Sequence, residues 1–298
     1  MRVTAAVPCY NGERFIAQTI ESLLHQSRPA DEILVIDDGS TDRSAEIVRR
    51  FGPPVRLIEH QTNKGLAEAR NTAMRCAQGE IIVFVDADAL ADPNMVEALL
   101  AEFTGDDIAA VGGQGIETKI KTVYDRWRQK YLSQTSGDER ITERGWIGGL
   151  CSAFRREALL KVGGFDPIYR TNAEDHDISY KLRQAGYRLV YTPHARVYHQ
   201  RGDDWRSLLK MVYRYAYWRH VVMKRNGIQP PHLLYGYQAI RDCIRGVQRD
   251  LIEDRDSRLA LISLTVLPVR LAAMARASFQ YRNLPTYLNA DWVHVGIR

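Results

Sequence analysis

The chain has 298 residues, of which 45% are hydrophobic and 26% charged, as in an ordinary folded soluble protein. This length fits one large α/β domain with an appendage, or two small domains. Residues 1–200 carry a net charge of −3 and residues 201–298 a net charge of +8, so the basic excess lies in the last third. It suggests an anionic partner there, either a membrane surface or a phosphorylated acceptor, although a solvated helical face explains it equally well.

The four cysteines are scattered, with no paired spacing for zinc or redox chemistry: Cys9, Cys76, Cys151 and Cys243. They are typical of reduced core residues in a reducing compartment. The amino terminus enters a predicted strand and turn at once, which does not match a signal peptide. We therefore expect a cytoplasmic protein.

Strand and helix patterns alternate through the first third of the chain. Short apolar runs predict strands at 3–7, 33–36, 55–59, 81–85 and 108–112. Helical periodicity and capping signals predict intervening helices at 13–25, 42–50, 66–77 and 93–103, with Thr41 or Asp42 as the cap of the second and Asp92 of the fourth. This alternation predicts a mostly parallel sheet with helices on both faces.

The regular alternation of strand and helix patterns ends after about residue 115. The pattern predicts a charged helix at 119–134, a helix at 174–185 capped by Thr171 or Asn172, and short strands at 189–191 and 196–199. From residue 205 onward the chain is typical of helices, with a break at 227–231.

The run 259–269 is apolar, too short to span a bilayer, and closed by Pro268 and Arg270. It continues into an apolar face with basic flanks. That pattern fits a helix in a membrane interface, and it fits a helix packed on the domain or a dimer contact almost as well.

Two acidic pairs close buried strand patterns. Asp37 and Asp38 follow the run 33–36, and Asp86 and Asp88 follow the run 81–85. The carboxyl ends of parallel strands border the crevice where open α/β sheets bind ligands. Because unpaired carboxylates there carry a large desolvation cost, a cationic partner is expected. A divalent metal carrying a nucleoside diphosphate meets that need.

Six runs in order resemble family 2 nucleotide-sugar glycosyltransferases of the GT-A fold: AVPCYNGE (6–13), VIDDGSTD (35–42), NKGLAEARN (63–71), FVDADA (84–89), EDHDISYKLRQAGY (174–187) and VYH (197–199). Each run alone is weak, and their shared order over residues 1–200 is a strong signal. The resemblance implies an α/β GT-A catalytic domain at 1–200, with a nucleotide-binding half at 1–115 and an acceptor half at 116–200. Residues 201–298 would then form a basic helical extension that associates with a membrane or dimerises.

The resemblance and the residue chemistry together predict the donor site. The predicted nucleotide-sugar-binding residues are Pro8, Tyr10, Asn11, Glu13, Asp38, Gly65, Arg70 and Asp86. Asp38 would accept a hydrogen bond from the base, and the Arg70 guanidinium suits phosphate. The alternatives are purely structural roles: an Asx-turn with a helix cap for the Asp37 and Asp38 motif, and a surface position on an amphipathic helix for Arg70.

The resemblance implies a Mg²⁺ or Mn²⁺ cofactor, with Asp88 as the direct ligand, assisted by Asp86 and His199. Two neighbouring carboxylates suit a hard cation whose other ligands are water and diphosphate oxygens. A histidine near a strand end is as often a structural residue, so the place of His199 in the site remains open.

The resemblance makes Asp175 the general base, which would take the proton of the acceptor hydroxyl. One base and one displacement imply inversion at the anomeric carbon. The acceptor side would be formed by Trp146, Gly148, Gly149 and Glu174. Compensation of a helix dipole by Glu174 and Asp175, and a core position for Trp146, are the structural alternatives.

We therefore expect transfer of a single sugar from a nucleoside-diphosphate sugar to a glycan or lipid-linked acceptor of the cell envelope, at the inner face of the plasma membrane. The chain lacks the Gln-x-x-Arg-Trp pattern of processive synthases, and 217–219 only faintly resembles it. A nucleotidyltransferase making an activated sugar and a catalytically silent nucleotide-binding scaffold are the alternatives. No nucleic-acid-binding module is recognised, and a homodimer stays open.

Overall fold

The computed structural model describes residues 1–227 and 232–287. These residues divide into two compact units. The first contains 1–118 and 134–201, and the second contains 119–133 together with the described residues from 202 onward. The predicted division into a nucleotide-binding half and an acceptor half concerns function and stays a prediction.

Within the described residues, the first unit holds an eight-stranded sheet in the order β3-β2-β1-β4-β7-β6-β8-β5. The strands are β1 (Val3–Cys9), β2 (Glu32–Asp37), β3 (Val55–Glu59), β4 (Ile81–Val85), β5 (Ala89–Ala91), β6 (Ile108–Glu117), β7 (Cys151–Arg155) and β8 (Arg188–His199). Strands β3, β2, β1 and β4 are parallel, and β7 is antiparallel to both of its neighbours. The predicted α/β class with a mostly parallel sheet is confirmed.

Helices flank this sheet and explain why its central strands are buried throughout. They are α1 (Ile16–Leu24), α2 (Ser44–Arg49), α3 (Leu66–Cys76), α4 (Met95–Leu100), α6 (Arg156–Lys161) and α7 (Glu174–Gln184). Every residue of β1, β2 and β4 is buried, as expected for strands covered on both faces. Helix α1 buries Ile16, Ile20 and Leu23, one helical stripe, in the same core cluster as these strands.

Two strands were mispredicted in length. The predicted strands at 189–191 and 196–199 are one strand, β8, and the strand predicted at 108–112 extends to Glu117. The β6–β8 ladder contains a register shift between Gly112 and Gln114, which carries it past the polar stretch in the middle of β8. Strand β7 was not predicted, because its small residues follow a Gly-rich run.

The predicted helix caps were wrong in detail. Helix α7 is preceded by Ala173, whose φ of 75° is left-handed, and neither Thr171 nor Asn172 caps it. Helix α4 has Asn94 as its N-cap, because Asp92 instead accepts the Asn94 backbone N–H in a local turn. Helix α2 likewise starts after Arg43. Local turns before these helices compete with side-chain capping.

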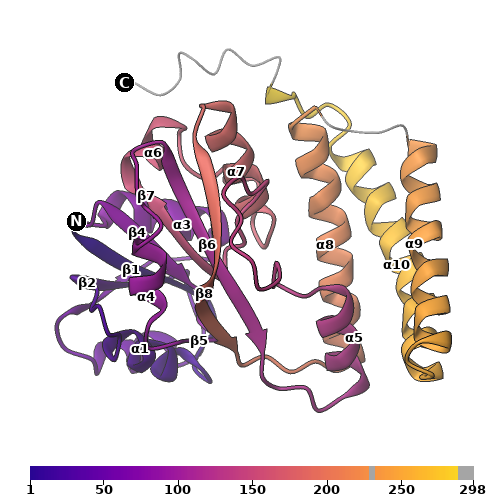
Figure 1. The fold of residues 1–298 in the computed structure, drawn as a ribbon, viewed down its shortest axis with the longest axis horizontal. Coiled ribbons are helices and arrows are strands. Elements are labelled where there is room, and N and C mark those ends of the chain that lie inside the picture. Colours follow the sequence, from indigo (N-terminus) through magenta and orange to yellow (C-terminus); the bar gives the residue numbers. More distant parts are fainter. Residues whose placement is uncertain (228–231, 288–298) are drawn as a thin grey trace. The chain divides into compact units, whose positions relative to one another are not determined.

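The second unit is helical, with α5 (Val123–Tyr131), α8 (Trp205–Arg225), α9 (His232–Ile252) and α10 (Ser257–Gln280), and α10 packs beside both α8 and α9 (Figure 1). Trp127, Leu208, Met211, Ile262 and Val266 are among its core residues. The predicted break at 227–231 lies almost wholly outside the described residues, as does 288–298.

A buried polar network ties three of these helices together. The indole N–H of Trp127 donates to Ser263 Oγ at 2.9 Å, and Ser263 Oγ donates to Asp250 Oδ2 at 2.7 Å. Lys130 Nζ lies 2.9 Å from Asp250 Oδ1. Asp250 is fully buried, so these donors compensate its lost hydration.

The apolar run 259–269, expected to be too short to span a bilayer and to be closed by Pro268 and Arg270, is part of the longer helix α10. The helix runs through Pro268 to Gln280, since a proline removes only one backbone donor and buried residues lie both before it (Val266) and after it (Ala273). Among the described residues it is the one helix long and apolar enough to cross a membrane, with a mean hydropathy of 1.6 over its best window. A third of that window is buried within the protein.

Candidate functional site

The loops after β1 and β2 are joined by hydrogen bonds. Asn11 adopts a φ of 52°, its Oδ1 accepts the Thr41 backbone N–H at 2.9 Å, and its own N–H donates to Ser40 Oγ at 2.9 Å. The Glu13 carboxylate accepts the backbone N–H of Arg43 at 3.1 Å. The predicted donor residues Asn11 and Glu13 thus shape this loop.

Two other predicted donor residues flank the same loop. Pro8 is buried within β1, whereas the Tyr10 side chain is 51% exposed. Tyr10 therefore has an exposed aromatic side chain that a ligand can contact.

Asp38 is a buried carboxylate that fixes the segment before α3. Its oxygens accept the backbone N–H groups of Lys64 at 2.9 Å and Gly65 at 2.8 Å, and His60 Nδ1 lies 2.6 Å from Oδ1. Gly65 has a φ of 98°, and a Cβ there would lie 2.8 Å from the Arg170 backbone. Because a carboxylate offers about four lone-pair positions, Asp38 retains capacity for one more donor. Its contact with a base stays a prediction.

Arg70 is buried at the centre of the site, with 1% of its surface exposed. Its Nη2 donates to Asp86 Oδ1 at 3.1 Å and to the carbonyl oxygen of Gly149 at 3.2 Å, and Nε lies 3.2 Å from Glu174 Oε1. The guanidinium lies 4.8 Å from the Phe84 ring centroid. Within the described part of the chain its Nε and Nη1, both buried, have no hydrogen-bond partner.

Asp86 and Asp88 follow β4 in a turn, with about a third of each side chain exposed. Desolvation raises the pKa of Asp86. The negative charges of Asp88 and Asp175 raise it further, and the positive charge of Arg70 opposes the rise. Desolvation also acts to raise the pKa of Asp88, but the hydrogen bond and charge of His199 outweigh it and the net shift is downward. Asp88 is therefore more readily ionised than Asp86.

His199 lies between two carboxylates. Its Nε2 is 3.3 Å from Asp88 Oδ2, and its Nδ1 is 3.0 Å from Glu117 Oε1. Desolvation acts to lower the pKa of His199, but the two carboxylates raise it to about 9. Glu117 was missed by the sequence analysis, because it belongs to none of the six runs. The strand pairing that places it beside His199 is the signal that finds it.

The residues fit a divalent cation that is completed by a ligand. Within residues 1–227 and 232–287, no three His, Cys, Asp or Glu side chains converge closely enough to hold a metal by themselves. Asp86, Asp88 and His199 supply carboxylate oxygens and an imidazole, and Mg²⁺ sites of this kind take their remaining ligands from phosphates and water. The donor chemistry therefore agrees with the predicted cofactor.

Asp175 lies in the first turn of α7 and is half-buried. Its Oδ2 accepts the Gly149 backbone N–H at 3.1 Å, and its Oδ1 accepts the His176 backbone N–H at 2.8 Å. Gly149 in turn accepts from Arg70, which donates to Asp86. The predicted base and the predicted metal site thus belong to one continuous hydrogen-bonded cluster.

Glu174 is buried beside Asp175. Desolvation, then the charge of Asp175, raise the pKa of Glu174 to about 8, while Arg70 opposes the rise. Its Oε2 has no hydrogen-bond partner among the described residues, which disfavours the ionised form further. This carboxyl lies beside Arg70 inside the cluster. Its contact with the acceptor substrate stays a prediction.

Trp146 is half-buried and stacks on His176, with ring centroids 4.1 Å apart and an interplanar angle of 19°. A Cβ on Gly148 would only touch the Trp146 ring at 3.4 Å, whereas one on Gly149 would lie 2.4 Å from Arg70 Nη2. Close packing therefore requires a glycine at position 149 but not at position 148.

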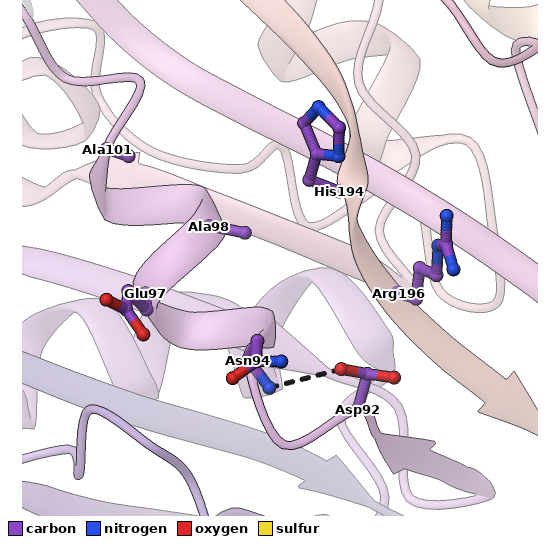
Figure 2. Close-up of a pocket in the computed structure, with 7 residues that line it drawn as sticks. All are labelled: Asp92, Asn94, Glu97, Ala98, Ala101, His194 and Arg196. Carbon is purple, nitrogen blue, oxygen red and sulfur yellow. Dashed lines mark hydrogen bonds between the residues drawn. The ribbon is translucent and has the colours of Figure 1, made fainter.

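A polar pocket opens elsewhere on the first unit, between α4 and β8 (Figure 2). It is lined by Asp92, Asn94, Glu97, Ala98, Ala101, His194 and Arg196. These described lining residues include none of the predicted site residues. The candidate site is defined by its charges and hydrogen bonds and does not coincide with this pocket.

The model of the family described as Glycosyl transferase family 2 matches residues 4–163, more than half of the chain. The chain belongs to glycosyl transferase family 2. The enzyme class predicted from the six runs, a glycosyltransferase, is confirmed at the level of the family.

Two relatives illustrate what the chain is similar to. The poly-beta-1,6-N-acetyl-D-glucosamine synthase of Staphylococcus epidermidis is 27% identical over 232 residues, 75% of this chain and 56% of the synthase. The glucosyl-dolichyl phosphate glucuronosyltransferase of Haloferax volcanii is 24% identical over 236 residues, 74% of this chain and 75% of that protein. The chain thus spans about half the length of the synthase.

Two solved structures share the fold. The mannosyltransferase PcManGT from Pyrobaculum calidifontis, in complex with GDP-Man and Mn²⁺, is 26% identical with a TM-score of 0.60, covering 93% of this chain and 75% of that one. S. aureus TarS 1–349 in complex with UDP-GlcNAc has a TM-score of 0.58 at 17% identity, covering 96% and 93%. The second likeness concerns the fold alone. The GT-A fold implied by the sequence is confirmed.

Proposed function

We propose that the protein is an inverting, metal-dependent glycosyltransferase that moves one sugar from a nucleoside-diphosphate sugar to an acceptor hydroxyl. The observation that carries this proposal is a hydrogen-bonded cluster. In it Arg70 donates to Asp86 and to the Gly149 carbonyl, and the Gly149 N–H donates to Asp175. A candidate metal-side carboxylate and a candidate base are thereby held at one site. The GDP-Man and Mn²⁺ in the PcManGT complex support the donor class and the cofactor.

The donor would lie along the loops after β1, β2 and β4. Tyr10 offers an exposed aromatic face to a base or ribose, and Asp38 retains an acceptor position. Asp88, Asp86 and His199 would hold Mg²⁺ or Mn²⁺ against the diphosphate. A divalent cation there supplies Lewis-acid stabilisation of the charge that develops on the leaving group.

Asp175 is the proposed base. Two backbone N–H groups, from Gly149 and His176, donate to its carboxylate and orient it. The carboxylate takes the acceptor hydroxyl proton as the acceptor oxygen bonds to the anomeric carbon. The bond from that carbon to the diphosphate oxygen breaks on the opposite side, which inverts the configuration.

The acceptor would approach the start of α7, where Trp146 stacks on His176 next to Asp175. An aromatic face of this kind can contact a sugar ring. The named relatives act in poly-N-acetylglucosamine and dolichyl-phosphate chemistry, which supports a glycan or lipid-linked acceptor here.

We also propose a peripheral position on an anionic membrane, at the cytoplasmic face, for the second unit. Several large apolar side chains of α9 and α10 are exposed: Tyr237, Ile240, Ile244, Leu251, Ile252, Leu261, Leu264 and Phe279. Residues 201–298 add a net charge of +8, which complements anionic lipid. Exposed apolar residues with basic neighbours suit interfacial binding. A homodimer contact through the same helices is the alternative.

The central experiment is a product assay with a panel of UDP- and GDP-sugars, a lipid-phosphate acceptor, and Mn²⁺, Mg²⁺ or EDTA. We expect metal-dependent release of the nucleoside diphosphate together with a glycoside of inverted anomeric configuration. Pyrophosphate and a new nucleotide sugar would instead identify a nucleotidyltransferase. Tight nucleotide binding with no turnover on any donor would indicate a scaffold, and either result overturns the proposal.

A further inference from the structure

We propose that Glu117 is a positioning residue that sets the tautomer and orientation of His199 for metal binding. This inference rests on the proposed metal-dependent function. It assigns a role to a residue that lies outside the sequence runs of the catalytic domain, and that is not itself a metal ligand. Its support is the backbone register of three strands and two side-chain distances.

The backbone fixes the two side chains next to each other. Glu117 is the last residue of β6 and His199 the last of β8, and the two are direct partners in the parallel ladder. On the other side of β8, Ala89 of β5 pairs with His199. The His199 carbonyl also accepts the Thr118 hydroxyl at 2.9 Å. His199 therefore has little backbone freedom, and its ring direction depends on its side-chain partners.

The two ring nitrogens face different carboxylates. Nδ1 is 3.0 Å from Glu117 Oε1, and Nε2 is 3.3 Å from Asp88 Oδ2. Glu117 is 9% exposed, whereas Asp88, the partner of the other ring nitrogen, is about one-third exposed. Nδ1 therefore faces the interior and Nε2 faces the proposed cation position beside Asp88.

The chemistry of an imidazole makes this asymmetry useful. A metal binds the lone pair of one ring nitrogen, and the other nitrogen then carries the hydrogen. An ionised glutamate accepts hydrogen bonds and donates none, so Glu117 selects the tautomer with hydrogen on Nδ1. That tautomer leaves the lone pair on Nε2, next to Asp88. A carboxylate bonded to the far nitrogen also increases the basicity of a metal-binding histidine.

The test measures binding of Mn²⁺ by electron paramagnetic resonance, with UDP or GDP present, in wild type, H199A, E117A and E117Q. We expect E117A to weaken Mn²⁺ binding about 10–100-fold, the usual effect of removing such a partner. E117Q keeps an acceptor oxygen and loses the charge, so its loss should be smaller, at least about threefold. E59Q is the matched control, because Glu59 ends β3 of the same sheet and pairs with the exposed Arg49.

A second readout follows the tautomer directly. Long-range ¹H–¹⁵N spectra of histidine-labelled protein with Mg²⁺ and UDP or GDP, assigned with H199A, should show hydrogen on Nδ1 of His199 in wild type, E117Q and E59Q. E117A should show a mixture of both tautomers. A purely structural role for Glu117 would lower thermal stability without changing either readout.

The outcomes separate this inference from the function on which it rests. If wild type binds no Mn²⁺ with either nucleotide, the metal-dependent function fails and the inference with it. If wild type binds Mn²⁺ and H199A does not, but E117Q binds as tightly as wild type, Glu117 has no positioning role. Should E117A fail to fold, the E117Q affinity alone decides.

Discussion

Arg70 Nη2 lies 3.2 Å from the carbonyl oxygen of Gly149, and a Cβ on Gly149 would come within 2.4 Å of the same nitrogen. Gly149, in the segment before β7, donates its backbone N–H to Asp175, and Arg70 donates to Asp86. The close approach of Gly149 and Arg70 therefore links the two aspartates. Any side chain at position 149 must therefore displace the guanidinium or the glycine backbone.

The first prediction concerns this contact. G149A should lower turnover about 100-fold, because an error of about 1 Å in the placement of reacting groups has that effect. It should also cost about 1–3 kcal/mol of stability through overpacking. Steady-state kinetics and denaturant unfolding measure both. G145A is the matched control, since a Cβ on Gly145 in the same segment meets nothing within 4 Å. Equal activities of the two variants would contradict the packing argument.

The proposed base is tested by D175N. Loss of a general base should reduce kcat about 10²–10⁴-fold while nucleotide binding, measured by calorimetry with Mn²⁺, stays close to wild type. The asparagine preserves an acceptor oxygen for the Gly149 N–H, so the fold should persist. A D175N enzyme with near-normal kcat would remove Asp175 from the mechanism.

The third prediction concerns stability against pH. Burial and Asp175 raise the pKa of Glu174 from 4.5 to about 8. Between these values the folded protein keeps a proton that the unfolded chain has lost, so this group makes the free energy of unfolding fall as pH rises. E174Q should flatten that fall between pH 4.5 and 8 in urea titrations. E157Q, at an exposed glutamate in the first turn of α6, should leave it unchanged.

The buried network of the second unit predicts a cost for S263A. Removing the hydroxyl leaves the Trp127 N–H and a fully buried Asp250 oxygen without their partner, which should cost about 1–3 kcal/mol. Thr265 is exposed on the same helix, so T265A should change stability by less than about 0.5 kcal/mol. Chemical denaturation followed by tryptophan fluorescence compares the two, and equal midpoints would show that the network contributes nothing.

Membrane association predicts preferential binding to vesicles that contain phosphatidylglycerol over vesicles of phosphatidylcholine alone. L261E and L264E should each weaken that binding about tenfold or more, since burying a leucine is worth about 1.5–3 kcal/mol. L160E alters an exposed leucine of the first unit and serves as the control. Sedimentation with vesicles measures the binding. Concentration-dependent dimerisation lost in L261E, without vesicle binding, would favour the alternative of a dimer contact.

Much of the fold of the first unit was predictable because its signals are local. The runs that became β1, β2 and β4 are short, apolar and flanked by polar residues, and each is wholly buried. Strand β7 and the continuity of β8 were not predictable in this way. The first depends on antiparallel pairing with β4 and β6, and the second on a register shift opposite Gly112.

The sequence by itself predicted Asp86, Asp88, Asp175, His199 and Arg70 as residues of the candidate site, since residue type, order and position after apolar runs are written in the chain. Only the tertiary structure decided their partners. It buried Arg70 between Asp86 and Glu174, and it set Glu117 beside His199. The physical reason is that hydrogen bonds and burial of these groups arise between residues 16 to 111 positions apart, and no local pattern encodes such contacts.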